Sequence, residues 1–308
     1  MKAIRVAAYG DPGVMQLRDV DIPVPGDDEV LIEIKASAVN PIDWKIVTGA
    51  MQRFIPLPLP FTPGVDAAGV VVEVGRNVTT LRAGDEVRGF IGIVGAYATH
   101  AVVAADKLAR KPASIDFDTA ASIPAAALTA WQALHEHGRV QQGDKVLIHA
   151  AAGGVGSAAV QMAALAGARV IGTASARNRD HVLHLGAEDV IDYNAGDFTK
   201  QVSDADLVLD LVGGDTQDRS WSVLRRGGRM VSTVSQPDAM RAREIGGEGM
   251  RFSARSDGRL LSDIVALYEA GRLSNRIDSI FALADAGDAM RKSMTQHVRG
   301  KVVIRTAD

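Results

Sequence analysis

The sequence predicts an α/β protein of two domains, a small β-barrel and a doubly wound parallel sheet, and three observations support this. The chain has 308 residues, which is long for one ordinary domain and sufficient for two. Its first third holds short β-branched runs separated by Gly and Pro, the pattern of a partly open barrel. From Lys111 onward strand and helix patterns alternate, which is typical of a parallel sheet covered by helices.

The predicted barrel strands follow one another closely along the first part of the chain. They are residues 1–6, 29–39, 64–75 and 97–103, where apolar residues alternate or cluster between Gly turns, and a further strand that begins at the turn 84–87. Residues 53–63 contain four prolines, so we expect an irregular loop there, bordering a pocket.

The predicted sheet domain alternates regularly between the two kinds of element. Its strands are 145–149, 169–174, 189–191, 206–211 and 229–234, and its helices are 120–137, 157–166, 180–185 and 260–270. A last helix at 284–294 and strand at 301–305 do not continue the sheet order, so we expect this segment to return to the barrel. Residues 1–115 and 270–308 are therefore assigned to the barrel domain and 116–269 to the sheet domain.

Charge and composition restrict the class of function. With 47% hydrophobic and 23% charged residues and a net charge of -3, the chain is an ordinary globular sequence without a basic field for nucleic acid or anionic membranes. No run of roughly 18 apolar residues predicts a membrane-spanning helix. The first residues do not resemble a signal peptide, so we expect a cytoplasmic protein. The absence of cysteine excludes disulfides, thiolate catalysis and every zinc site that uses Cys.

A glycine-rich turn between a strand and a helix carries the clearest chemical signal. The strand at 145–149 runs into Ala150-Ala151-Ala152-Gly153-Gly154-Val155-Gly156, and a helix follows. A dinucleotide pyrophosphate binds at such a turn because the first amides of the helix lack partners and the helix dipole favours an anion. A turn that only packs helix on sheet is the alternative, but the flanking elements favour cofactor binding. The expected cofactor residues here are Ala151 (in place of the first fingerprint glycine), Gly153, Gly154, Val155 and Gly156.

The end of the second strand predicts NADP(H) rather than NAD(H). An NAD enzyme places Asp or Glu about 20 residues after the glycines, on the ribose 2′-hydroxyl. Residues 173–179 read Thr-Ala-Ser-Ala-Arg-Asn-Arg and contain no carboxylate. A 2′-phosphate favours the Ser175 hydroxyl and a cation, for which Arg177 is the first choice and Arg179 lies nearby. The alternative for either arginine is a solvated surface charge.

Several motifs together resemble the quinone oxidoreductase and zeta-crystallin branch of the medium-chain dehydrogenase/reductase superfamily. The segment from Gly143 to Gln161 is similar to that branch's signature, with a departure shortly afterwards at Ala164. Residues 39–43 resemble its V-N-P-x-D segment, 63–69 its P-G-x-D-x-x-G segment, 123–130 its helix beside the nicotinamide, and 300–303 its terminal G-K-x-V strand. The resemblance implies a GroES-like catalytic domain, a Rossmann domain and an active-site cleft between them. It also implies a dimer or tetramer, of which we expect a homodimer.

The resemblance extends the list of expected cofactor residues. Thr129 is expected near the nicotinamide ribose or carboxamide, and Tyr193 beside the adenosine phosphate. Val212, Gly213 and Lys301 complete the predicted set.

No catalytic metal is expected. The sister branch, the zinc alcohol dehydrogenases, binds zinc through a Cys near the position of Asn40 and a His-Glu pair near Val65-Asp66. Asn40 and Val65 cannot serve as such ligands, and Asp43 and Asp66 have no Cys or His partner in the motif.

Without a Lewis acid, the chain suits acceptors that are already primed for hydride, such as quinones and α,β-unsaturated carbonyls. In the family, the residues after V-N-P line the acceptor pocket, which makes Asn40, Asp43, Trp44 and Lys45 the candidate catalytic residues. Lys45, where relatives often carry Tyr, either donates to the acceptor oxygen, pairs with Asp43 or is solvated. Trp44 either stacks on a flat acceptor or packs in the core.

The predicted function is that of an NADPH-dependent oxidoreductase that passes hydride to quinones or other activated carbonyls. Two alternatives stay open at this point: a reductase of enone or alkenal double bonds, and a non-catalytic NADPH-binding protein.

Overall fold

The computed structural model describes residues 1–306, which form two compact units. The barrel unit contains Met1–Ala125 and the chain from Ser256 onward, and the sheet unit contains Ala126–Arg255. The sequence placed the boundaries at 115/116 and 269/270. Two helices that were assigned to the sheet domain therefore belong to the barrel unit. Helix α2 (Phe117–Ser122) packs against barrel strands, and α8 (Gly258–Glu269) begins so close to the barrel that a Cβ on Gly258 would lie 2.5 Å from the carbonyl oxygen of Leu108.

Most strands of the barrel unit form one sheet of seven strands. Their order is β14-β15-β3-β4-β5-β7, with β6 pairing to β3, while β1 and β2 form a separate antiparallel pair. The strands are β1 (Lys2–Val6), β2 (Met15–Asp19), β3 (Glu29–Val39), β4 (Asp66–Val74), β5 (Glu86–Phe90), β6 (His100–Ala104), β7 (Leu108–Arg110), β14 (Ile277–Ala282) and β15 (Lys301–Arg305). The predicted boundaries of β3 and β15 are confirmed residue for residue, and the expected return of the last strand to the barrel is also confirmed.

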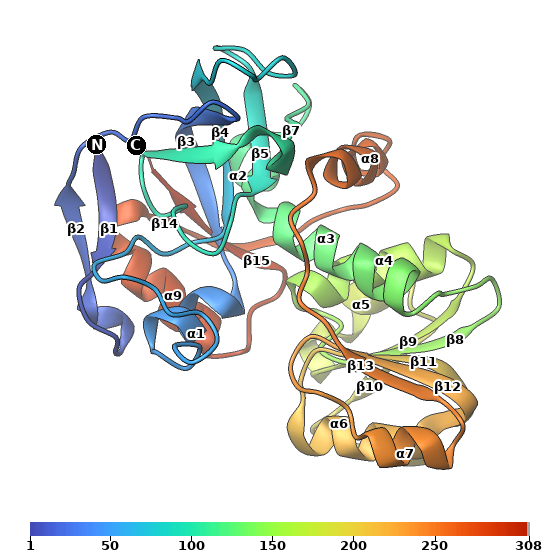
Figure 1. The fold of residues 1–308 in the computed structure, drawn as a ribbon. Helices are drawn as coiled ribbons and strands as arrows, with labels where there is room; N and C mark the ends of the chain where they lie inside the picture. Colours follow the sequence, from blue (N-terminus) through green and yellow to red (C-terminus); the bar gives the residue numbers. More distant parts are fainter. Residues whose placement is uncertain (307–308) are drawn as a thin grey trace. The chain divides into compact units, whose positions relative to one another are not determined.

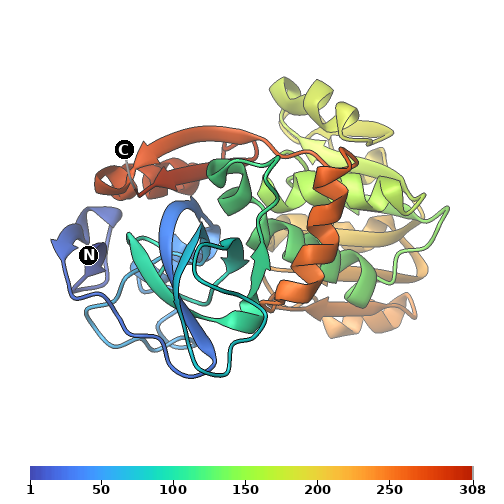
Figure 2. The same cartoon turned by 90° about the horizontal axis from the view of Figure 1, so that it is seen from above.

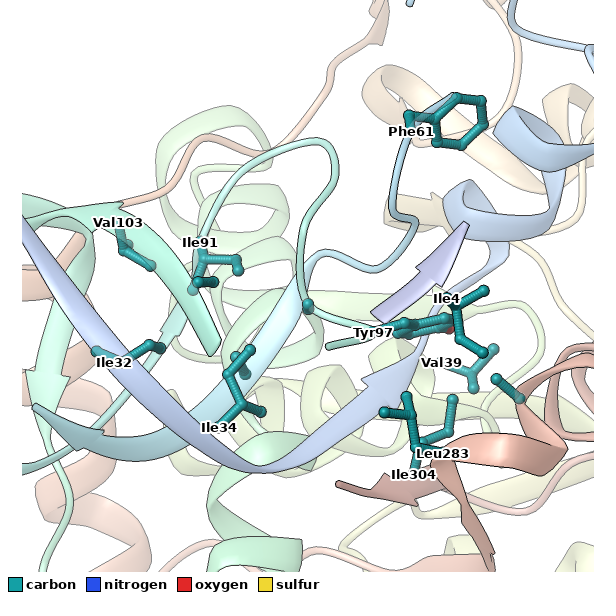
Figure 3. Close-up of a cluster of buried hydrophobic side chains, with 14 of the residues drawn as sticks. Ile4, Ile32, Ile34, Val39, Phe61, Ile91, Tyr97, Val103, Leu283 and Ile304 are labelled. Atoms are coloured by element: carbon teal, nitrogen blue, oxygen red, sulfur yellow. The ribbon is translucent and has the colours of Figure 1, made fainter. Parts of the chain in front are cut away.

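The long strand β3 organises this unit because it has different partners along its length. Its first half pairs with β6, its last four residues pair antiparallel with β15, and β4 runs along its other edge. Figure 2 shows the C-terminal strands, in red, beside the N-terminal strands of the same unit. Residues nearly 300 positions apart therefore share one core, in which Ile4, Ile34, Tyr97 and Ile304 are buried together (Figure 3).

Segment 40–47 contains a helix that hydrophobic periodicity did not predict. Helix α1 (Pro41–Val47) starts directly after β3, with Asn40 as the preceding cap residue and Pro41 in its first turn. Proline suits that position because the N–H groups of a helix's first turn have no partner within the helix, so the N–H that proline lacks is not needed. The Asp43 carboxylate accepts a hydrogen bond of 2.8 Å from the Asn40 backbone amide, which stabilises the helix start. A second helix of this unit, α9 (Ala286–Met294), packs against α1 and β15.

The sheet unit has the architecture that the sequence predicted. Its six strands are all parallel and follow the order β10-β9-β8-β11-β12-β13, which is the doubly wound order 3-2-1-4-5-6. They are β8 (Lys145–Ile148), β9 (Arg169–Ala174), β10 (Asp189–Asp192), β11 (Ala205–Asp210), β12 (Leu224–Ser232) and β13 (Glu248–Arg251). Helices α4 (Gly154–Leu165) and α5 (Arg179–His184) cover one face, and α6 (Gly214–Ser220) and α7 (Ala239–Glu244) cover the other (Figure 1).

Other differences from the predicted elements have local causes. The expected helix 120–137 is three segments: α2, α3 (Pro124–Trp131) and a π-helical stretch, Gln132–His137. Pro124 causes the first break, because proline has no backbone N–H to donate to the preceding turn and its ring clashes with the carbonyl four residues earlier. The strand expected at 97–103 starts at His100, since Tyr97 and Ala98 bond to β1 instead. Strands β13 and β14 are short or lie in polar surroundings, and hydrophobic periodicity did not predict them.

Among residues 1–306, no helix has the length and apolar character needed to span a membrane.

Candidate functional site

The glycine turn lies at the carboxyl end of the central strand β8 and leads into α4. Gly153 precedes the helix with an extended backbone, φ -77° and ψ 177°, and the chain turns at Ala150 with φ 51°. A Cβ on Gly156 would lie 2.2 Å from the Ala150 carbonyl oxygen, so glycine is required there for the helix to approach the strand. A Cβ on Gly153 would meet only that same oxygen, at 3.4 Å, an ordinary contact. The fold does not need glycine at 153, which is the result expected if a ligand needs that space.

Ala151, which replaces the first fingerprint glycine, is accommodated by a second glycine. Ala151 is fully buried, and its amide donates a 3.0 Å hydrogen bond to the Thr173 carbonyl on β9. A Cβ on Gly172 would lie 2.8 Å from the Ala151 methyl group. The methyl group therefore fits because residue 172 has no side chain, a compensation that the motif alone does not reveal.

The predicted 2′-phosphate residues gather at the ends of two neighbouring strands. Ser175 and Arg177 follow β9, Tyr193 follows β10, and these strands pair in register up to Ala174 and Asp192. Arg177 is exposed and Tyr193 is 50% exposed. Such exposure is expected of residues that bind a phosphate group in contact with solvent. The Arg179 guanidinium binds Asp189 at 3.0 Å and also the Val190 carbonyl.

Two buried polar residues that were not predicted from the sequence shape the same sheet edge. The Asp210 carboxylate at the end of β11 accepts hydrogen bonds from the amides of Val212 and Gly213, at 3.0 and 2.8 Å. It thereby fixes the turn that contains these two predicted cofactor residues. The signal in the sequence was an acid at a strand end, just before a glycine pair.

His149 is the second buried polar residue, between β8 and the glycine turn. Its ring nitrogens lie 3.1 Å from the Thr173 hydroxyl and 2.8 Å from the Ser220 hydroxyl. Burial lowers the pKa of His149 to about 4, so the ring is neutral at pH 7. We call the carboxyl ends of β8, β9, β10 and β11, with Gly153, Ser175, Arg177, Tyr193 and Gly213, the cofactor edge. Thr129 lies on α3 and is half-buried.

The predicted catalytic residues Asn40 and Asp43 belong to a buried polar cluster in the barrel unit. We define the polar cluster as Asn40, Asp43, Asp66, Tyr97 and Lys301, each less than 9% exposed. Its members come from the end of β3, the start of α1, the start of β4, the segment before β6 and the start of β15. Three of the five were predicted as site residues, whereas Tyr97 and the role of Asp66 were missed because they lie far away along the chain.

Hydrogen bonds connect the whole polar cluster. The Asn40 amide group donates to Asp66 Oδ2 at 2.8 Å and to the Ala38 carbonyl at 3.1 Å, and the Lys301 ammonium donates to Asn40 Oδ1 at 2.6 Å. Asp66 Oδ1 accepts from the backbone amide of Ala125, in the first turn of α3, at 2.8 Å.

The acidity of the Asp43 carboxyl group is strongly altered in the cluster. Burial, with a contribution from the nearby Asp66 carboxylate, raises the pKa of Asp43 from 3.8 to about 7. Its Oδ2 accepts hydrogen bonds from the Asn40 amide and the Tyr97 hydroxyl, and its Oδ1 is buried without a partner. Burial likewise raises the pKa of Asp66, whereas Lys301 opposes that shift.

Trp44 and Lys45 lie outside the polar cluster, on the same helix α1. Both are half-buried, and the Lys45 ammonium lies 5.6 Å from the centroid of the Trp44 ring. Trp44 packs against the barrel core, although its indole N–H is buried without an acceptor. Lys301, predicted as a cofactor residue, lies in the barrel unit against Asn40 and Asp66, and its contact with the cofactor remains a prediction.

The donor set around Asn40 and Asp66 does not fit a catalytic zinc ion. Such sites use Cys, His or carboxylate ligands in a tetrahedral arrangement. The chain has no Cys, and no group of three His, Asp or Glu side chains suited to a metal is present within residues 1–306. The Lys301 ammonium lies 3.4 Å from Asp66 Oδ2, so a cationic group is already in contact with the carboxylate that would bind a metal.

Comparison with family models identifies both parts of the chain. Residues 26–113 match the alcohol dehydrogenase GroES-like domain, and residues 185–304 match the zinc-binding dehydrogenase family. The second family is named for zinc, an ion that the donor set around Asn40 and Asp66 does not fit.

Individual relatives extend over nearly the whole chain. A chloroplastic quinone-oxidoreductase of Triphysaria versicolor is 32% identical and covers 99% of this chain and 98% of its own length. The quinone oxidoreductase of Sus scrofa is 33% identical, over 94% of this chain and 92% of its own.

Solved structures agree in fold along the entire chain. The quinone oxidoreductase of Coxiella burnetii superposes with a TM-score of 0.93 at 34% identity, covering 100% of this chain and 99% of that one. An NAD-dependent alcohol dehydrogenase superposes with a TM-score of 0.92 at 30% identity, with full coverage of both chains. The Escherichia coli quinone oxidoreductase, solved with NADPH, has a TM-score of 0.90 at 28% identity and covers 99% of this chain and 100% of its own.

The extent and identity of these matches, together with the barrel and the doubly wound sheet, show that this chain is an oxidoreductase belonging to the quinone oxidoreductase family of the medium-chain dehydrogenase/reductase superfamily.

Proposed function

We propose that the protein transfers hydride from NADPH to a quinone, or to another activated carbonyl compound, without a metal ion. The reduced nicotinamide supplies the hydride, which carries both electrons, and one proton from solvent or a side chain completes the hydroquinone. The products are NADP⁺ and hydroquinone, so atoms and charge balance without any further reactant.

The cofactor edge is the observation that carries the proposal. The unobstructed space at Gly153 faces the first turn of α4, whose free amides suit a pyrophosphate. The segment after β9 offers Ser175 and Arg177 and has no carboxylate at 173–179, which favours a 2′-phosphate over a bare 2′-hydroxyl. The E. coli quinone oxidoreductase was solved as a complex with NADPH, which supports the same cofactor here.

The choice of acceptor follows from what the barrel unit offers. Quinones and enones delocalise the charge that hydride brings, so they need orientation and one hydrogen-bond donor rather than a Lewis acid. We assign the donor role to Lys45, on helix α1, and the wall of the acceptor site to Trp44. Asn40 and Asp43 hold this helix from inside the unit. The names of the relatives from Triphysaria versicolor and Sus scrofa support a quinone acceptor.

The proposed function is tested by measuring initial rates of the purified protein with a panel of acceptors. NADPH oxidation is measured with a benzoquinone, a naphthoquinone, an enone and an alkenal, before and after exhaustive chelation, with bound zinc determined by elemental analysis. A parallel reaction offers a primary alcohol with NAD⁺, because one structural relative is named an NAD-dependent alcohol dehydrogenase. We expect quinone turnover that survives chelation and no alcohol oxidation.

Each other result selects a different function. Turnover of enones alone identifies a double-bond reductase, and NADPH binding without any turnover identifies a cofactor-binding protein. Stoichiometric zinc in active protein, or alcohol oxidation that chelation abolishes, contradicts the metal-free mechanism.

We also propose that the protein is a cytoplasmic homodimer. The strand β13 supports self-association, because it lies at an edge of the sheet and its outer side pairs with no strand of residues 1–306. Light scattering of the purified protein measures the subunit number. Cell fractionation decides the location, which matters because one of the relatives is named as chloroplastic.

A further inference from the structure

Lys301 is a buried cation at a point where three strands meet. Its side chain is only 5% exposed and lies at the start of β15, beside the end of β3 and the start of β4. The backbone around it is tightly placed, since a Cβ on the preceding Gly300 would lie 2.1 Å from the Arg276 carbonyl oxygen. A lysine is seldom this buried unless its charge is compensated.

The contacts of Lys301 determine how the Asn40 side chain is oriented. An ammonium group can only donate, and an ionised carboxylate can only accept. Asn40 therefore turns its oxygen to Lys301, at 2.6 Å, and its amide hydrogens to Asp66, at 2.8 Å, and to the Ala38 carbonyl. Both amide hydrogens are used inside the unit, so Asn40 serves as a fixed link between β3, β4 and β15.

Electrostatics make this cation necessary. Asp66 and Asp43 are both buried, on β4 and α1. Burial raises the pKa of the Tyr97 phenol, and both carboxylates raise it further. Burial also raises the pKa of Asp43, and the Asp66 carboxylate adds to that shift. Lys301 is the cation that lowers the pKa of both carboxyl groups. Without it, the ionised Asp66 would lack a counter-charge in a buried environment, which is strongly unfavourable.

We propose that Lys301 is a positioning residue of the acceptor site: its ammonium group takes the place of a metal cation between Asn40 and Asp66, and so fixes the junction of β3 and α1 that presents Trp44 and Lys45. This inference rests on the proposed function for its effect on turnover, but its electrostatic part concerns the polar cluster alone. It differs from a role of Lys301 in binding the cofactor, and the two roles predict different kinetics.

The kinetic test compares Lys301→Met with Lys200→Met, a matched control at an exposed lysine of the sheet unit. Because α1 loses its fixed anchor, we expect kcat with a quinone to fall by about ten- to a hundred-fold, the range for a small misplacement of an acceptor site. The Kd for NADPH, measured by fluorescence titration, should stay within about two-fold. A ten-fold weaker Kd with unchanged kcat assigns Lys301 to the cofactor and overturns the proposal.

A second measurement does not depend on activity. Chemical unfolding of the wild type, Lys301→Met and the double variant Lys301→Met/Asp66→Asn is followed at pH 5.5 and pH 8.5. At the higher pH, the carboxyl groups of the Lys301→Met variant ionise without a cation beside them. The loss of stability of this variant relative to the wild type should therefore be larger at pH 8.5 than at pH 5.5. The double variant removes the Asp66 charge and should recover a large part of this loss.

The outcomes separate the two ideas. A wild-type protein without turnover on any acceptor refutes the proposed function, while a pH-dependent, Asp66-linked loss of stability still supports the fixed cation. A loss that is equal at both pH values and is not relieved by Asp66→Asn means that Lys301 only fills space, and this overturns the inference. Failure of both variants to fold leads to the same conclusion, whereas folding of the double variant alone supports the proposal.

Discussion

The Tyr97 hydroxyl donates a 2.9 Å hydrogen bond to Asp43 Oδ2 inside the barrel unit, joining the segment before β6 to the first turn of α1. The same oxygen accepts the Asn40 backbone amide at 2.8 Å, while Asp43 Oδ1 is buried and has no partner. Burial of this carboxyl group favours its protonated form, whereas the two hydrogen bonds that Oδ2 accepts favour the ionised form. The helix that carries Trp44 and Lys45 is thus attached to the core through a group that titrates near neutrality.

This arrangement predicts a pH-dependent stability. The pKa of Asp43 is raised to about 7 in the folded protein, above the ordinary value of 3.8. The folded protein therefore keeps a proton that the unfolded chain releases, so the contribution is present at low pH and is lost as the pH rises through about 7. We expect the stability of the wild type, relative to Asp43→Asn, to decrease between pH 5 and pH 8 in urea unfolding.

Tyr97→Phe is the matched control for this titration. The Tyr97 hydrogen bond lowers the pKa of Asp43, so its removal should move the transition to higher pH without abolishing it. A wild type and an Asp43→Asn variant with parallel pH profiles would show that Asp43 is ionised throughout.

The two glycines of the turn should respond differently to substitution. Gly153→Val should leave the protein folded, because a Cβ there makes only a 3.4 Å contact, but it should weaken NADPH by at least about a hundred-fold, roughly 2.7 kcal/mol. Gly156→Ala should instead destabilise the fold by about 1–3 kcal/mol, since its Cβ would lie 2.2 Å from a backbone oxygen. Calorimetric titration and urea unfolding of both variants provide the measurement. Unchanged NADPH affinity in folded Gly153→Val would place the phosphates elsewhere.

Cofactor preference should depend on Arg177. The wild type is expected to bind NADPH at least about ten-fold more tightly than NADH, or about 1.4 kcal/mol. Arg177→Ala should remove most of this difference by weakening NADPH alone. Arg179→Ala is the control, because the Arg179 guanidinium is held by Asp189 at 3.0 Å, and it should change the preference less. Equal affinities of the wild type for the two cofactors contradict the assignment of the 2′-phosphate site.

The proton or hydrogen bond to the acceptor is assigned to Lys45. Lys45→Ala should lower kcat by roughly ten- to a thousand-fold, the range for losing one oxyanion donor or general acid. NADPH affinity should barely change, because the expected phosphate site belongs to the sheet unit. Steady-state kinetics with one quinone and one enone measure the effect, with Asn40→Ala in parallel. Turnover of Lys45→Ala within about two-fold of the wild type would transfer the role to solvent.

The sequence was sufficient wherever the determining residues are neighbours along the chain. The strand, glycine turn and helix at 145–156 were predicted because the whole motif is contiguous, and the hydrophobic periodicity of β3 defined that strand from Glu29 to Val39. The same holds for the missing carboxylate after β9. Local patterns also contained the signals for helix α1, a proline in the first turn and an acid at its third residue, although no helix was predicted for that segment.

Only the tertiary structure decided what lies together across long separations in the chain. Lys301 meets Asn40 because β15 pairs antiparallel with β3, Val302 opposite Val39, and it meets Asp66 because β4 pairs along the other edge of β3. Periodicity shows which face of a strand is buried but not which strand becomes its neighbour, since backbone hydrogen bonds form equally well with any partner. The burial that raises the pKa of Asp43, and the methyl group of Ala151 that fits because Gly172 faces it, depend on these pairings in the same way.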